Sequence, residues 1–90
     1  FAISDMLAVG AYHAIKQADL RIPQDIKVMG SDNLSFTPYL DPPLTTIAVK
    51  RNDHLQEAAK LLVGMLNGEI NKPSEIMIAS EVIIRESTAF

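Results

Sequence analysis

The sequence contains no cysteine, which excludes disulfide scaffolds and metal sites built on thiolates. No apolar run approaches the roughly 20 residues that are needed to span a bilayer, so we expect no membrane contact. The eight lysines and arginines are scattered, only Lys50 and Arg51 are adjacent, and the net charge is -3. Because binding to nucleic-acid phosphates needs clustered basic residues, this segment itself is not expected to hold DNA.

Motifs of several enzyme classes are absent as well. The sequence has no glycine-rich phosphate loop, no G-x-S-x-G elbow and no H-E-x-x-H pair. His13 and His54 lack the spacing that would pair them on a metal. Asp5 and Asp32 could form an acid–base pair, but nothing else typical of a hydrolase accompanies them. We therefore predict no catalytic residue, no metal site and no cofactor, and an enzyme on a flavodoxin-like fold is the least favoured interpretation.

The chain has 90 residues, of which 48% are hydrophobic, as is typical of soluble globular proteins. A domain of this size buries a small fraction of its surface and is marginally stable alone. The sequence begins inside the apolar run Phe1–Ile3 without an initiator methionine. We therefore expect a part of a larger protein, whose other strands complete the sheet.

Strand-like and helical segments alternate along the chain. Apolar and β-branched runs predict strands at residues 1–4, 25–30, 44–49, 75–79 and 81–87. Apolar residues at helical spacing predict one helix at residues 6–18, capped by Asp5, and a second from Asn52 or Asp53 to about Leu66, with a capping box formed by Asp53 and Gln56. Residues 31–43 contain three prolines and are expected to form a loop with up to one helical turn. The alternation predicts an α/β fold with a parallel sheet.

The first predicted helix is apolar on two sides. One stripe, expected to pack on the sheet, comprises Leu7, Ala11, Ala14, Ile15 and Ala18. Met6, Val9 and Tyr12 gather on the opposite side, and leaving three such side chains exposed would forfeit several kcal/mol, at roughly 1.5–3 kcal/mol each. Either missing parts of the same domain cover this side or two subunits share the helix. We favour the shared helix and predict a homodimer interface formed by Met6, Val9, Tyr12 and Tyr39.

Polar residues follow the first two predicted strands, where ligands of parallel sheets bind. Ser4–Asp5 and Ser31–Asn33 would meet at one edge, and their carboxylates, hydroxyls and amide suit the vicinal hydroxyls of a polyol. Asp5 is more readily explained as a helix cap, whereas Asp32 precedes no obvious helix and is the better ligand candidate. Phe36 and Tyr39 could stack on a sugar or fill the loop, and the pattern does not choose between these roles.

Four segments, taken together, resemble the LacI/GalR family of transcriptional repressors. They are Phe1–Ala11, Leu20–Asn33, Leu40–Ile47 and Ile84–Ala89, in the family's order and spacing. Ser31 departs from the aromatic residue usual beside the ligand aspartate, and Asp19 departs from the glycine usual before Leu20. The resemblance implies a three-layer periplasmic-binding-protein-like type I fold with two subdomains around a cleft.

The resemblance also implies roles for individual segments and residues. Residues 1–49 and 80–90 would belong to the carboxyl-terminal effector-binding subdomain, and residues 50–79 to the amino-terminal one. Asp32 falls on the family's ligand-binding aspartate, Ser4 on a cleft position, and Val9 with its helix on the dimer interface. We predict a small effector, a sugar or sugar phosphate, bound by Asp32, Ser4, Asp5 and Phe36.

The predicted function is allosteric control of transcription in the cytoplasm. The effector would regulate operator binding by a helix-turn-helix upstream of these residues. An exported sugar-binding transport protein of the same fold is the main alternative, although the tail Arg85–Thr88 favours a repressor. A further alternative keeps the repressor and replaces the sugar by a purine or a phosphoprotein corepressor.

Overall fold

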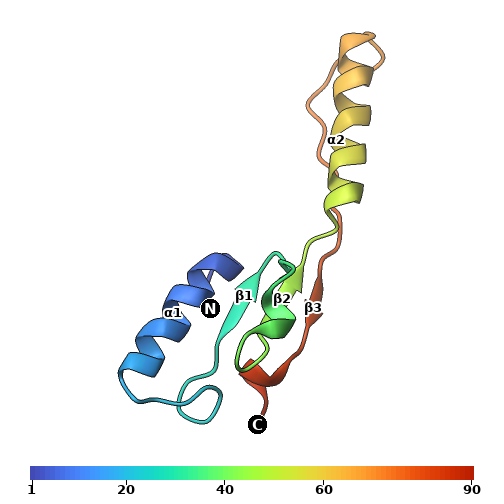
Figure 1. Ribbon diagram of the computed structural model, residues 1–90. Coiled ribbons are helices and arrows are strands. Elements are labelled where there is room, and N and C mark those ends of the chain that lie inside the picture. The colour runs from blue at the N-terminus through green and yellow to red at the C-terminus, as the bar shows by residue number, and fades with distance from the viewer. The chain divides into compact units, whose positions relative to one another are not determined.

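The chain forms two units in the computed structural model, which describes residues 1–90 (Figure 1). Unit 1 comprises Phe1–Val49 and Glu81–Phe90, and unit 2 comprises Lys50–Ser80. Unit 1 therefore combines the two ends of the chain, and unit 2 is one continuous insertion. The assignment of these parts to the two subdomains of a larger protein stays a prediction.

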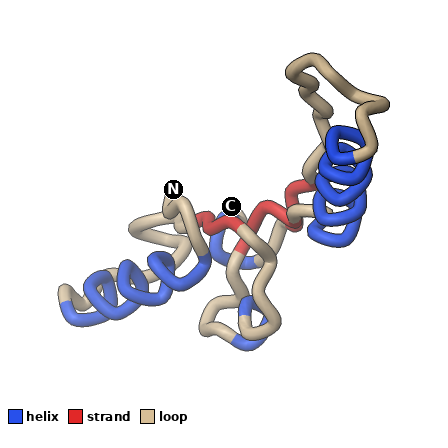
Figure 2. The backbone as a smooth tube through the Cα atoms, turned by 90° about the horizontal axis from the view of Figure 1, so that it is seen from above, coloured by secondary structure: helices blue, strands red, loops and turns tan.

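The sheet of unit 1 contains three short strands, β1 (Met29–Ser31), β2 (Thr45–Ala48) and β3 (Glu81–Ile83). They lie side by side in the order β1-β2-β3 (Figures 1 and 2). Strands β1 and β2 are parallel, as expected, and β2 and β3 are antiparallel. The sheet is therefore mixed, because the chain leaves unit 1 after β2 and re-enters it through β3.

Two of the expected strands are absent, and a third is shorter than expected. Residues 1–4 form a single ladder-like bond, from Ala2 N to Met29 O at 2.8 Å, before the first helix begins. Residues 75–79 form no strand, and residues 84–87 leave the sheet and enter a short 3-10 helix, Glu86–Thr88. A strand needs a neighbour for its backbone groups, which composition alone does not supply.

Helix α1 (Asp5–Gln17) lies within one residue of the expected bounds, but its cap differs. Ser4 is the N-cap: its backbone is extended and its Oγ accepts a hydrogen bond from Leu7 N at 3.3 Å. Asp5 occupies the first helical position, where its side chain is fully buried. The prediction of Asp5 as N-cap was therefore wrong, because an interior hydrogen-bonding role takes its carboxylate away from the helix end.

The buried face of α1 also differs from the predicted stripe. Asp5, Ala8 and Tyr12 are the buried residues of the helix, whereas Leu7 is 56% exposed. Tyr12 is only 5% exposed, and its hydroxyl donates a hydrogen bond of 2.8 Å to Pro42 O. The prediction that Tyr12 lies in a dimer interface was therefore wrong. The spacing of apolar residues placed it on the outer side of the helix, although it is a core tyrosine whose hydroxyl is hydrogen-bonded.

The core of unit 1 packs α1 against the sheet and its loops. It consists of Ala8, Tyr12, Ile22, Val28 and Leu44, with Ala2, Ile15 and Leu40 packed against it. The loop after β1 contains the expected helical turn, a 3-10 helix at Thr37–Tyr39. Every buried polar side-chain atom has a hydrogen-bond partner, as native interiors require.

Unit 2 is built on α2 (Arg51–Leu66). The helix begins before Asp53, with Lys50 at the N-cap and no side-chain cap, so the predicted capping box of Asp53 and Gln56 was wrong. It ends as expected at Asn67, followed by Gly68 with a φ of 74°. Neither α1 nor α2 combines the length and apolarity that crossing a membrane demands.

Candidate functional site

A buried carboxylate connects α1 to the sheet. Asp5 Oδ1 accepts a hydrogen bond of 2.6 Å from Thr46 Oγ1, and Asp5 Oδ2 accepts one of 2.8 Å from Leu34 N. Gly30 passes beside this carboxylate, because a Cβ at Gly30 would overlap Asp5 Oδ1. Asp5 is thus buried, with both oxygens hydrogen-bonded inside unit 1, which supports a structural role over its predicted contact with an effector.

The turn after β1 has an unusual backbone. Asp32 has a φ of 110° and Asn33 a φ of 51°, values that residues with a side chain rarely adopt. Two hydrogen bonds hold this turn: Asp32 N donates to Ile47 O at 2.8 Å, and Asn33 N donates to Thr46 Oγ1 at 3.2 Å. Such conformations persist where the surrounding structure enforces them, and they concentrate at functional sites.

Ser4 and Asp32 follow two segments that a backbone hydrogen bond joins, from Ala2 to Met29. The bond of 2.8 Å from Ala2 N to Met29 O places residues 1–4 beside β1. Ser4 follows Ala2 by two residues and Asp32 follows Met29 by three, and both are half-buried. The carboxyl-end edge of a parallel pair is the usual place for a ligand in α/β folds.

The aromatic candidates differ in exposure. Phe36 is partly buried and directly precedes the 3-10 helix, whereas Tyr39 at the end of that helix is 86% exposed. Their predicted contacts, Phe36 with an effector and Tyr39 with a second subunit, stay predictions.

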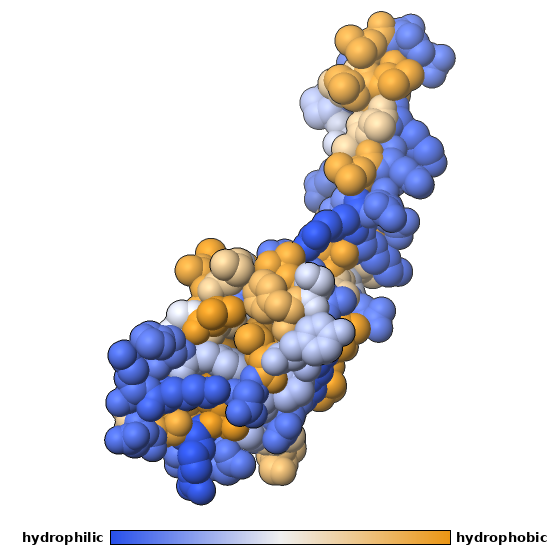
Figure 3. Space-filling model, in the orientation of Figure 1, coloured by the Kyte–Doolittle hydropathy of each residue, from blue (hydrophilic) through white to orange (hydrophobic).

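The outer side of α1 exposes apolar side chains. Met6 is 62% exposed, Leu7 56% and Val9 36%. Figure 3 shows apolar side chains, coloured orange, at the surface of both units. A cluster of this kind on one helix marks a surface that another chain segment or subunit can cover.

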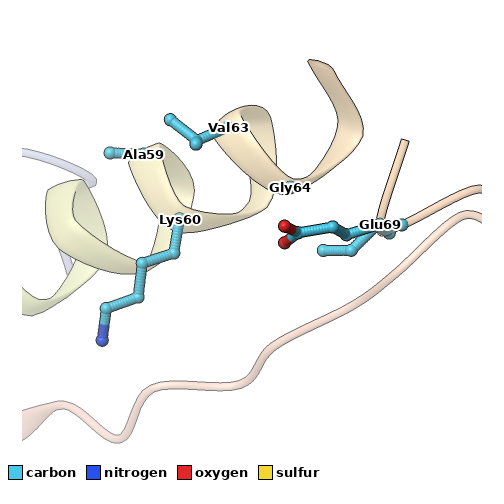
Figure 4. A pocket seen from close by; sticks show the side chains of 6 residues that line it. Ala59, Lys60, Val63, Gly64 and Glu69 are labelled. Carbon is cyan, nitrogen blue, oxygen red and sulfur yellow. The ribbon is translucent and has the colours of Figure 1, made fainter. Parts of the chain in front are cut away.

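A hollow in unit 2 lies apart from the predicted effector residues in the sequence. It is lined by Ala59, Lys60, Val63, Gly64, Glu69 and Ile70, from α2 and the turn that follows it (Figure 4). The turn is held by bonds from Glu69 N and Ile70 N to Gly64 O, at 2.9 and 3.1 Å. Lys60 and Glu69 are its charged lining residues, and no group of histidine, cysteine, aspartate and glutamate in the structure could hold a metal ion.

The predictions from the sequence missed Thr46 and Arg85. Thr46 Oγ1 joins Asp5 to the backbone of Asn33, and the Arg85 guanidinium reaches Asn33 Oδ1 at 3.1 Å. The proline-threonine and Arg85–Thr88 segments were noted only for their resemblance to a family. Their hydrogen-bonding roles depend on partners that are distant in sequence.

Comparison with known proteins gives consistent matches. Residues 1–88 match the family described as a periplasmic binding protein-like domain. The ribose operon repressor of Haemophilus influenzae is 42% identical over 97% of this chain and 26% of the repressor. The chain thus spans about a quarter of the length of such relatives.

Two solved structures share this arrangement. A LacI family transcriptional regulator from Enterococcus faecium, solved with bound ribose, has a TM-score of 0.82 and 35% identity over 99% of this chain and 33% of its own. The lac repressor dimer bound to operator and the anti-inducer ONPF has a TM-score of 0.85 and 29% identity over 97% of this chain and 27% of its own. These relatives are transcriptional regulators.

Proposed function

Because this chain belongs to the periplasmic-binding-protein-like domain family, in the form found in LacI-type transcriptional regulators, we propose that it is the carboxyl-terminal part of the effector-sensing domain of such a regulator. The observation that carries the proposal is the match of 99% of the chain to a regulator solved with bound ribose. Residues 1–49 and 81–90 would contribute to its carboxyl-terminal subdomain, and residues 50–80 to its amino-terminal one.

The proposed effector is a small sugar, with ribose the first candidate. One relative is a ribose operon repressor, and another regulator was solved with bound ribose. Asp32 and Ser4 would contact the sugar hydroxyls, since a carboxylate can accept two hydrogen bonds and a hydroxyl can both donate and accept. Phe36 would lie against the sugar, and Asp5 would hold the loop after Asp32 in place.

Effector binding would control operator affinity through differential binding to two conformations of the whole protein. A ligand shifts such an equilibrium only by its preference for one state, typically by about 1–3 kcal/mol of coupling. The operator would be bound by a helix-turn-helix upstream of these residues. The relative bound to operator supports this arrangement.

The working form would be a homodimer in the cytoplasm. Met6, Val9 and Tyr39 are the proposed interface residues, supported by their exposure and by the dimeric relative. The relatives described above are transcriptional regulators, which favours a regulator over an exported transport protein and over an enzyme.

The test is a calorimetric titration of the intact regulator with D-ribose, with ribose 5-phosphate and a purine base as competing candidates. We expect Asp32→Ala to weaken sugar binding at least about tenfold, as loss of hydrogen bonds to a charged group would. Asp53→Ala, at an exposed position of α2, is the matched control. Unchanged affinity of Asp32→Ala would remove Asp32 from the site, and binding of the purine alone would replace the sugar as effector.

A further inference from the structure

Arg85 extends from the segment after β3 to the loop after β1. Its Nη1 donates hydrogen bonds of 2.8 Å to Thr37 Oγ1 and of 2.8 Å to Leu44 O. Its Nη2 donates a bond of 3.1 Å to Asn33 Oδ1. All three acceptors are neutral oxygens, and the planar guanidinium presents its donors to them as a fixed fork.

The residue that Arg85 reaches stands next to the proposed effector aspartate. Asn33 continues the positive-φ turn that begins at Asp32. The Asp32 amide donates to the Ile47 carbonyl, the Asn33 amide donates to the Thr46 hydroxyl, and Arg85 holds the Asn33 side chain. Because such backbone conformations are costly, the turn depends on these outside contacts.

The same guanidinium holds the other end of the loop. Thr37 is fully buried, accepts from Arg85 Nη1, and donates through its hydroxyl to Leu34 O at 2.8 Å. Leu34 N in turn donates to Asp5. Residues 32–37 are therefore held by Asp5 from α1 and by Arg85 from the segment that follows β3.

We infer that Arg85 is a positioning residue for effector binding, which fixes the loop at residues 32–37 and thereby the carboxylate of Asp32. The inference rests on the proposed function, since Asp32 is the proposed effector contact. Lysine at this position would keep the charge but offer a single nitrogen, which cannot reach all three acceptors in the same way. The positioning role therefore depends on the shape of the guanidinium and not on its charge.

The experiment compares Arg85→Lys with Arg21→Lys in the intact regulator. Arg21 is an exposed arginine of unit 1 that pairs with Asp25, so its replacement controls for the chemical change alone. D-ribose affinity is measured by calorimetry and folding by urea unfolding. We expect Arg85→Lys to bind ribose at least about tenfold more weakly, the effect of losing charge-assisted hydrogen bonds, while Arg21→Lys binds as the parent does.

A double-mutant cycle separates positioning from a general loss of stability. Arg85→Lys, Asn33→Ala and the double variant are titrated with D-ribose. Because Arg85 holds the loop through both Asn33 and Thr37, the double variant should lose less affinity than the two single losses combined. Additive losses, or an Arg85→Lys variant with parental affinity, would overturn the inference.

A failure of the proposed effector gives a different result from a failure of the inference. If the parent protein binds no ribose, the effector proposal fails, and amide hydrogen exchange of residues 32–37 decides the role of Arg85. Faster exchange in this loop in Arg85→Lys than in Arg21→Lys supports positioning. Equal exchange in the two variants contradicts it.

Discussion

The carboxylate of Asp5 and the hydroxyl of Thr46 form a buried hydrogen bond of 2.6 Å between residues 41 positions apart. Both residues are fully buried. Thr46 Oγ1 also accepts from Asn33 N, and the second Asp5 oxygen accepts from Leu34 N. The pair therefore fixes the start of α1, β2 and the loop after Asp32 to one another.

Replacing this carboxylate by an amide should destabilise the fold. In Asp5→Asn, an NH2 group would face one of the two donors that the carboxylate accepts. We expect the free energy of unfolding to fall by about 1–3 kcal/mol, the cost of a buried hydrogen-bonding group without its partner. Urea unfolding of the intact protein measures this change. The exposed control Asp53→Asn should stay within about 0.5 kcal/mol of the parent, and equal stability of the two variants would contradict the role of Asp5.

A charge on the outer side of α1 should disrupt the proposed dimer. Val9 is partly exposed on the same helix as the more exposed Met6 and Leu7. In Val9→Asp, an unpaired carboxylate would have to be buried between two subunits, which is strongly unfavourable. We expect sedimentation velocity of the intact protein to show monomer where the parent is dimeric. Gln17→Asp, at the exposed end of the same helix, should leave the dimer intact; a normal Val9→Asp dimer would show that this side of α1 is not the interface.

Tyr12 should stabilise the fold in a manner that depends on pH. Burial raises the pKa of the Tyr12 phenol above its ordinary value of 10.0, because the interior disfavours the phenolate. At neutral pH we expect Tyr12→Phe to lose about 1 kcal/mol of stability with the hydrogen bond to Pro42 O.

The sign of the pH effect follows from that pKa. The raised pKa contributes stability that is fully present below pH 10 and is lost as the pH rises through the value of the folded state. The difference in unfolding free energy between the parent and Tyr12→Phe should therefore shrink above about pH 10. Urea unfolding of both proteins from pH 7 to 11 measures it, and a difference that does not change with pH would contradict burial of this phenol.

Local patterns in the sequence predicted the elements that have a strong hydrophobic periodicity or clear terminating residues. The limits of α1, the parallel direction of β1 and β2, and the stop at Asn67–Gly68 follow from such signals. The direction of β3 did not, because it depends on where the chain re-enters the sheet after unit 2. The strand expected at residues 75–79 lacks a partner within the chain, so its composition had no structural consequence.

The residues of the candidate site also differ in whether a local sequence pattern reveals them. Asp32 follows a strand and a glycine, a pattern that the sequence displays directly. Arg85 is separated from its partners Thr37, Leu44 and Asn33 by 48, 41 and 52 residues, and no local pattern reveals such contacts. Asp5 was misassigned because a first-turn aspartate suits a helix cap as well as an interior acceptor.

The hydrogen bonds of Ser87 can form only late in the synthesis of the chain. The Ser87 hydroxyl donates to Val28 O at 2.6 Å and accepts from Thr45 N at 2.8 Å, so residues near the end of the chain join two segments made much earlier. A ribosome must synthesise all of unit 2 before these bonds can form. Residues 1–49 of unit 1 therefore stay incompletely paired while some thirty residues are added, and shortening the chain before Glu81 would leave them without β3.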